Sequence, residues 1–150
     1  MPRAFVILAV GLVAIPFAQA VTGPALTAPQ YRAQASSICR LAKHRLDALP
    51  TPTRSGNPSD LSAMAPFLRA GIRIEGAEIR QLQTLTPPPS LARLVTRGLA
   101  IKHQQVETFT KLVALANAGK LTISEVIAGL LQDPDSAAIW KRVGASVCQY

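Results

Sequence analysis

The sequence contains few of the residues and motifs from which catalytic and metal sites are usually built. It has two cysteines and two histidines in 150 residues, and it lacks phosphate-binding loops, dinucleotide fingerprints and zinc-ribbon spacings. No serine lies between glycines in the pattern of a nucleophile elbow. His44 and His103 form no His-x-x-His or Glu-x-x-His pair of the kind that builds di-metal sites in helical bundles. We therefore predict a protein that is not an enzyme and uses no cofactor.

Acidic residues are also scarce, which leaves the chain basic. Sixteen Lys and Arg residues outnumber eight Asp and Glu residues, and the formal net charge is +8. A basic surface favours anionic partners, such as an envelope polymer, a lipid surface or another envelope protein. A soluble protein whose charge only prevents aggregation would have the same composition.

The N-terminus has the parts of a secretory signal peptide. Arg3 precedes an apolar run over residues 4–17, and the small residues Ala18 and Ala20 form a cleavage sequence before Val21. The run is short for a membrane-spanning helix, although an uncleaved signal anchor is the alternative. We predict a signal peptide, cleavage after Ala20, and a secreted protein or one in the periplasmic or cell-envelope space. No stable transmembrane span would remain, and export argues against nucleic acid as a partner.

The rest of the chain is long enough for one domain with one core. We predict a flexible lead over residues 21–30 and a helical-bundle domain over residues 31–150. Apolar residues recur at spacings of three and four, which predicts three longer helices and two short C-terminal ones. The expected helices cover about 29–49, a segment from 59 or 60 to the proline corner at 87–89, 90–118, a segment after 122, and a segment from 134. This pattern predicts an all-α antiparallel helical bundle.

Several residues are suited to begin or end these helices. Ser59 or Asp60 is a possible cap for the second helix, Ser90 for the third and Asp133 for the last. Residues 122–125 have the sequence of a capping box, and Gly119 is a good C-terminal stop.

The two cysteines, Cys39 and Cys148, predict one structural disulfide. An even number of cysteines in an exported chain favours a bond, and two cysteines allow a single pairing. The bond would join the first helix to the C-terminus. Two free buried cysteines are the alternative.

Three residues are candidate ligands for a metal or a small molecule. His103 and Glu107 share a helical face at one-turn spacing, and Glu75 interrupts the apolar stripe of the second helix. Their convergence across the bundle would make a binding site, whereas a solvated polar face is the alternative for His103 and Glu107. Glu75 also forms a carboxylate pair with Glu78, for which neighbouring arginines suggest ion pairing.

Five arginines are candidates for an anion-binding patch. If the proline corner folds the second and third helices back on each other, these side chains would meet near it and could grip phosphate or carboxylate groups. They are Arg69, Arg73 and Arg80 on the second helix and Arg93 and Arg97 on the third.

Three sequence elements resemble a group of uncharacterised exported proteins of high-GC bacteria. Residues 38–42 match an Ile-Cys-x-x-Ala helix, residues 82–88 match a Leu-x-x-Leu-x-Pro-Pro corner, and residues 147–148 match a C-terminal Val-Cys. The resemblance implies a disulfide-closed helical bundle in the envelope and implies no activity. The basic charge departs from the neutral composition expected of that group.

Two hypotheses for function follow. The first is an exported, non-enzymatic helical bundle that acts by surface contact with an anionic partner at the cell envelope. The alternative is a bundle that binds a small ligand or a metal with Glu75 and His103.

Overall fold

The computed structural model describes residues 24–52, 61–130 and 135–149. Its helices are α1 (Ala28–Asp47), α2 (Met64–Gln83), α3 (Pro89–Asn117), α4 (Ile123–Leu130), α5 (Asp135–Val143) and the short 3₁₀ helix η1 (Ser146–Cys148). The predicted signal peptide and its cleavage residues lie outside the described residues, as do the predicted caps Ser59, Asp60 and Asp133. In the part that is described, no helix combines the length and hydrophobicity needed to cross a bilayer.

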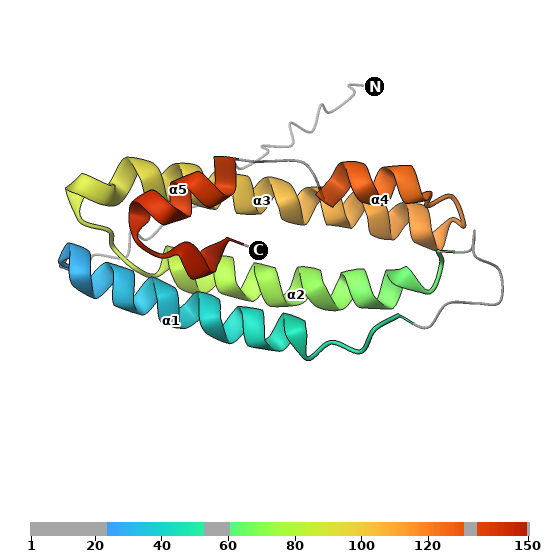
Figure 1. The fold of residues 1–150 in the computed structure, drawn as a ribbon, viewed down its shortest axis with the longest axis horizontal. Coiled ribbons are helices and arrows are strands. Elements are labelled where there is room, and N and C mark those ends of the chain that lie inside the picture. The colour runs from blue at the N-terminus through green and yellow to red at the C-terminus, as the bar shows by residue number, and fades with distance from the viewer. Residues whose placement is uncertain (1–23, 53–60, 131–134, 150) are drawn as a thin grey trace, which may run out of the picture.

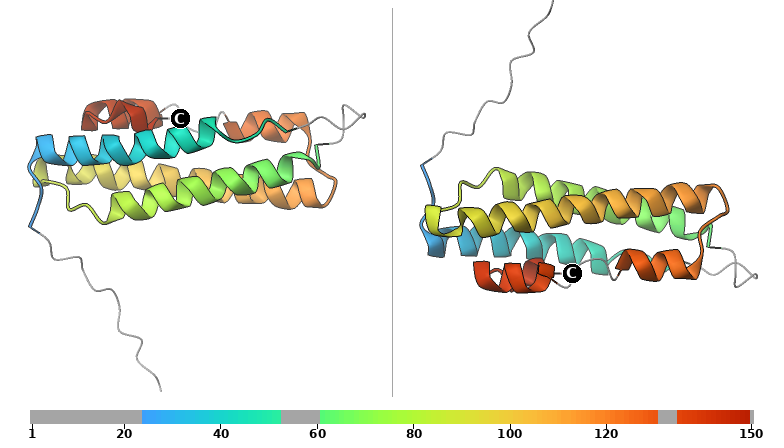
Figure 2. Two further views of the ribbon diagram at one scale, coloured as in Figure 1. Left: turned by 90° about the horizontal axis from the view of Figure 1, so that it is seen from below. Right: turned by 90° about the horizontal axis from the view of Figure 1, so that it is seen from above.

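The helices pack as an antiparallel bundle, which confirms the predicted fold class. Helices α1, α2 and α3 run in alternating directions, and α4 and α5 follow one another back along α3 (Figures 1 and 2). Helix α2 packs against both α1 and α3, while η1 packs against α1 and α5. Among the described residues there is no strand. The arrangement is that of a four-helix bundle whose fourth helix is divided into α4 and α5.

The first helix begins at Ala28, within one residue of the predicted start, and a capping box precedes it. Thr27 Oγ1 accepts a hydrogen bond from the Gln30 N–H at 3.4 Å, and Gln30 Oε1 accepts one from the Thr27 N–H at 2.9 Å. The Leu26 N–H also donates to the Thr86 carbonyl at 3.0 Å. The predicted lead over residues 21–30 is therefore wrong from residue 26 onward, and the ordered domain starts before Tyr31.

Three other predicted helix ends lie in the described residues. The structure confirms the capping box before α4 and the stop at Gly119, and it contradicts the predicted cap at Ser90. At α4, Glu125 Oε2 accepts a hydrogen bond from the Thr122 N–H at 2.8 Å, and Thr122 Oγ1 accepts one from the Glu125 N–H at 3.3 Å. This confirms the capping box. Gly119 follows α3 with a φ of 65°, as its role as a stop requires. Pro88, and not Ser90, occupies the N-cap position of α3.

Helices α2 and α3 are offset from each other along their axes. Gln83, the last residue of α2, lies level with His103 in the middle of α3, and their Nε2 atoms are 3.2 Å apart. The start of α3 extends beyond the end of α2, and α3 also packs against α5 (Figure 1). Gly98 makes this packing close, since a Cβ atom there would lie 2.9 Å from Cζ2 of Trp140.

The interior contains two apolar clusters with charged side chains between them. The first cluster surrounds the cysteines and comprises Tyr31, Ala35, Cys39, Leu82, Leu91, Val95, Trp140, Val143, Ala145 and Cys148. The second lies near the start of α2 and the end of α3 and comprises Ala65, Leu112, Ala116 and Leu121, with partly buried neighbours that include Leu68 and Phe109. Along α2, Glu75 and Glu78 lie between Leu68 and Leu82, and along α3, Lys102 lies between Val95 and Phe109. These three charged residues are called the polar layer below.

Candidate functional site

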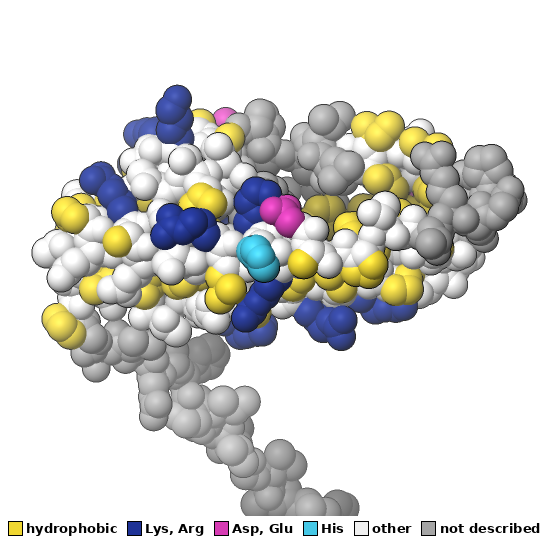
Figure 3. All heavy atoms as spheres, turned by 60° about the horizontal axis from the view of Figure 1, so that its bottom comes forward, with side chains coloured by type: hydrophobic (Ala, Val, Ile, Leu, Met, Phe, Trp, Pro, Cys, Tyr) yellow, Lys and Arg dark blue, Asp and Glu magenta, His cyan; other side chains and the backbone are white. Residues whose placement is uncertain are grey.

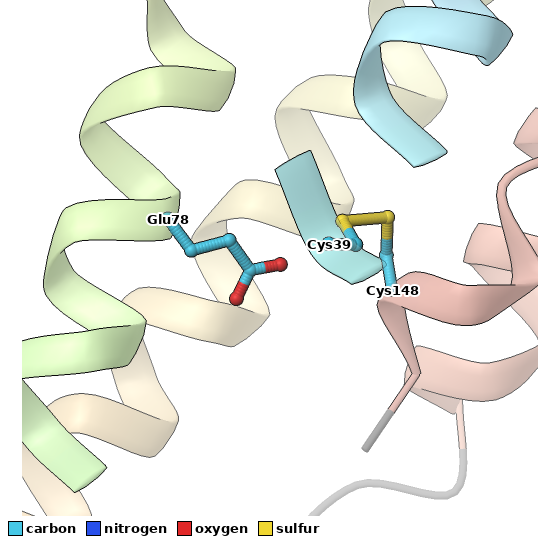
Figure 4. Close-up of side chains that lie close together, drawn as sticks. All are labelled: Cys39, Glu78 and Cys148. Carbon is cyan, nitrogen blue, oxygen red and sulfur yellow. A yellow bond between two sulfur atoms is a disulfide. The ribbon is translucent and has the colours of Figure 1, made fainter. Parts of the chain in front are cut away.

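Cys39 and Cys148 form the predicted disulfide. The S–S distance is 2.05 Å and the Cα atoms are 5.0 Å apart, across a sequence separation of 109. The bond joins α1 to η1 (Figure 4), and both cysteines are buried. Because η1 packs against both α1 and α5, the disulfide ties the first helix to the C-terminal part of the bundle.

A buried ion pair connects α2 to α3 next to this disulfide. Lys102 Nζ lies 3.2 Å from Glu78 Oε1 and 3.3 Å from Glu78 Oε2, and the two side chains are 4% and 0% exposed. The Glu78 carboxylate points toward the disulfide (Figure 4). Removing an ion from water costs several kcal/mol in a folded protein unless a partner of opposite charge compensates, so each member of this pair depends on the other.

The partner of Glu78 was not predicted correctly. Arg73 and Arg80 are exposed, whereas Glu78 faces the interior and pairs with Lys102. The sequence held a signal for this pair, since Lys102 falls on the inward stripe of α3, one turn before Val106. A lysine in an otherwise apolar stripe requires a buried acidic partner.

Glu75 lies in the wall of an apolar groove. The groove has a volume of about 240 Å³ and is formed by the end of α1, the first half of α2, the second half of α3 and α4. Its lining residues are Leu46, Leu49, Met64, Phe67, Leu68, Gly71, Glu75, Phe109, Leu112 and Val126. Among these described residues, Glu75 is the one ionisable group. Helix α4 contributes Val126 and leaves Ile123 and Ile127 exposed at 61% and 50%.

The groove changes the acidity of Glu75. Burial raises the pKa of its carboxyl group from 4.5 to about 7, the charge of Lys102 lowers the pKa, and the charge of Glu78 raises it. Desolvation is the largest of these effects. It raises the pKa because a carboxyl group away from water is penalised in its ionised form. Glu75 therefore exchanges its proton near neutral pH.

The stability of the protein should depend on pH through Glu75. The folded state binds the Glu75 proton more tightly than the unfolded state does. The contribution of this proton to the free energy of unfolding is therefore complete below pH 4.5 and is lost as the pH rises to about 7. Urea unfolding at pH 4 and pH 8 measures the effect. The free energy of unfolding of wild type should fall by a value on the order of 3 kcal/mol between pH 4 and pH 8, and Glu75→Gln should lack this fall. The exposed Glu107→Gln is the matched control, and equal pH dependence in wild type and Glu75→Gln would contradict the prediction.

The predicted convergence of Glu75, His103 and Glu107 is wrong. His103 and Glu107 are exposed on the outer side of α3, where they line a shallow depression with Gln104 and Lys111 that does not include Glu75. Glu75 faces the groove instead. His103 and Glu107 share one face of α3, but that face is exposed, whereas the neighbouring Lys102 is the residue that points into the bundle.

One cluster of metal-ligand residue types does occur in the described part of the chain. It consists of Cys39, Cys148 and Glu78, whose ligand atoms lie within 4.8 Å of one another. The two sulfur atoms are bonded to each other and are not thiolates. Since thiolate is the form of cysteine that binds metals, the cluster in this state offers no metal site.

The predicted arginine patch does not form as one surface. Arg69 Nη1 donates to Asn117 Oδ1 at 3.1 Å, which places Arg69 beside the end of α3. Arg93 lies near the start of the same helix, about 36 Å away along the axis at the usual rise per residue. The proline corner does not bring these residues together, because Arg69 lies near the start of α2 and the corner follows the end of that helix.

The remaining arginines are also separated. Arg97 forms an exposed ion pair with Asp135 at the start of α5, with a distance of 2.7 Å. Arg73 and Arg80 are exposed on α2. Figure 3 shows Lys and Arg side chains spread along the visible face, and not gathered in one patch.

No protein-family model, curated protein or solved structure matches this chain. The described structure defines the class of protein as a disulfide-closed all-α bundle with a buried ion pair and an apolar groove. The resemblance to exported proteins of high-GC bacteria stays a prediction.

Proposed function

We propose that this protein is an exported, non-enzymatic binding protein that holds a small, largely apolar molecule in the groove beside Glu75. The observation that carries the proposal is the groove itself, an apolar recess of about 240 Å³ with one carboxyl group in its wall. Export is supported by the N-terminal sequence pattern and by a disulfide that suits an oxidising compartment.

The properties of the groove favour binding over catalysis. Its size is just below the usual range for ligand pockets, about 300 to 1,000 Å³, so it suits a small molecule or the apolar end of a larger one. Apolar side chains supply the affinity, and a single carboxyl group can orient a polar end. Acid–base catalysis commonly requires a second group placed to complement the first, and the described lining provides none.

Filling the groove should weaken binding of the ligand. Gly71 lines it, and a Cβ atom at this position would be 3.8 Å from Leu46 Cδ2, so a larger side chain at residue 71 would occupy the groove. We expect the neutral fluorescent probe N-phenyl-1-naphthylamine to bind wild type saturably and to lose at least tenfold in affinity in Gly71→Leu. Fluorescence titration measures both values.

Gly76→Leu is the matched control because Gly76 lies on the same helix but does not line the groove. Circular dichroism establishes that both variants are folded. The proposal is overturned if wild type shows no saturable binding, or if Gly71→Leu binds the probe as well as Gly76→Leu does.

Surface contact with an anionic envelope polymer or lipid surface is the second candidate. It is favoured by the distribution of charge: Glu78 is buried and Glu75 lies in the groove wall, while Arg73, Arg80 and Arg93 are exposed. Retention on phosphatidylglycerol vesicles that falls steeply between 50 and 300 mM salt would support this candidate, and salt-independent retention would contradict it.

A further inference from the structure

The charges of the polar layer do not balance when Glu75 is ionised. Lys102 contributes one positive charge and lies within 3.3 Å of both carboxylate oxygens of Glu78. Glu75 is a second carboxyl group close enough for its pKa to be affected by both residues. With Glu75 ionised, the layer therefore carries one excess negative charge in a largely apolar interior, and with Glu75 protonated it is neutral.

Among the residues that the structure describes, the walls of the groove supply no compensating cation. Helix α1 contributes Leu46 to the lining, α3 contributes Phe109 and Leu112, and α4 contributes Val126, all of which are apolar. The charged groups that act on Glu75 are Glu78 on its own helix and Lys102 on α3. A positive charge brought into the groove by a ligand would complete the balance.

We propose that the groove selects a ligand with a positively charged nitrogen attached to an apolar body, and that the ligand's ammonium group replaces the proton on Glu75. This inference rests on the proposed function, because it requires that the groove is a binding site. The apolar body contacts the side chains of α1, α3 and α4, and the ammonium donates a charge-assisted hydrogen bond to the carboxylate. A neutral ligand of the same shape lacks that bond, and an anionic ligand adds a second negative charge.

The affinity for a cationic ligand should depend on pH, because the ammonium group competes with a proton for the Glu75 carboxylate. At pH 8 Glu75 is mostly ionised and is ready to pair, whereas at pH 5.5 the ligand must displace a proton. An alkylamine stays protonated at both values, since its pKa is about 10. Its affinity should therefore rise between pH 5.5 and pH 8, and the affinity of an alcohol of the same length should stay constant.

Three eight-carbon probes test the inference directly. Octylamine, octanol and octanoate compete with N-phenyl-1-naphthylamine for the purified protein, and fluorescence reports their dissociation constants. In wild type at pH 8, octylamine should bind at least tenfold more tightly than octanol, and octanoate more weakly than either. In Glu75→Gln the preference should disappear, so that octylamine binds no more tightly than octanol. In wild type at pH 5.5, the preference for octylamine should fall at least threefold.

The outcomes separate this inference from the proposed function. If octanol binds wild type but octylamine binds no more tightly at pH 8, the charge selection is wrong and the groove remains a binding site for neutral molecules. A preference for octylamine that survives in Glu75→Gln, or that is equal at both pH values, also overturns it. If none of the probes binds, both the inference and the proposed function fail.

Discussion

Replacing both Cys39 and Cys148 with alanine should lower the free energy of unfolding by about 4 to 5 kcal/mol. The disulfide spans a sequence separation of 109, so its removal restores a large amount of conformational freedom to the unfolded chain. It also opens the bundle where η1 joins α1 to α5. Urea unfolding of the double variant and of oxidised wild type, followed by circular dichroism, gives the difference.

Wild type treated with a reductant is the control for the lost sulfur atoms, because it keeps both side chains while removing the bond. The reduced protein and the double variant should show similar losses. A loss below about 1 kcal/mol in both would contradict the view that the disulfide contributes through the unfolded state.

Replacing Lys102 with methionine should cost about 3 to 5 kcal/mol at pH 7. The substitution keeps an unbranched side chain of similar size but leaves the Glu78 carboxylate without the ammonium group that lies 3.2 Å away. Since Glu78 is inside the bundle, water cannot easily replace that partner. Chemical denaturation of the purified variant measures the loss.

A second substitution separates the charge effect from a packing effect. The double variant Lys102→Met with Glu78→Leu removes both charges, and it should recover most of the stability lost in Lys102→Met, because a matched apolar pair often replaces a buried ion pair at little cost. If the losses of the two single variants add in the double variant, the two side chains do not act as a pair, and the interpretation of the polar layer is wrong.

Much of the fold could be predicted because it depends on local signals. The apolar spacing identified the three long helices, and the Thr122 capping box and Gly119 marked helix ends that the structure confirms. The disulfide followed from the presence of two cysteines. The start of α1 was predicted to within one residue, but the capping box of Thr27 and Gln30 that precedes it was not recognised.

The candidate site was predicted less well because it depends on how the helices are offset. The sequence identified Glu75 as a polar residue in an apolar stripe, and the structure places it in the groove wall. Its predicted partners were wrong, because residue spacing gives the face of one helix and not its height relative to the next. The proline corner was expected to bring Arg69 and Arg93 together, but Arg69 lies near the start of α2, beside the end of α3, and Arg93 lies near the start of α3.

The most direct test of the account is to locate the bound probe with methyl-labelled NMR. The proposed binding site is the groove lined by α1, α2, α3 and α4. Addition of N-phenyl-1-naphthylamine should shift the methyl signals of Leu46, Leu68 and Val126, while those of Val95 and Val143 in the closed cluster around the disulfide stay in place. Shifts confined to Val95 and Val143, or no shifts at saturating probe, would contradict the claim.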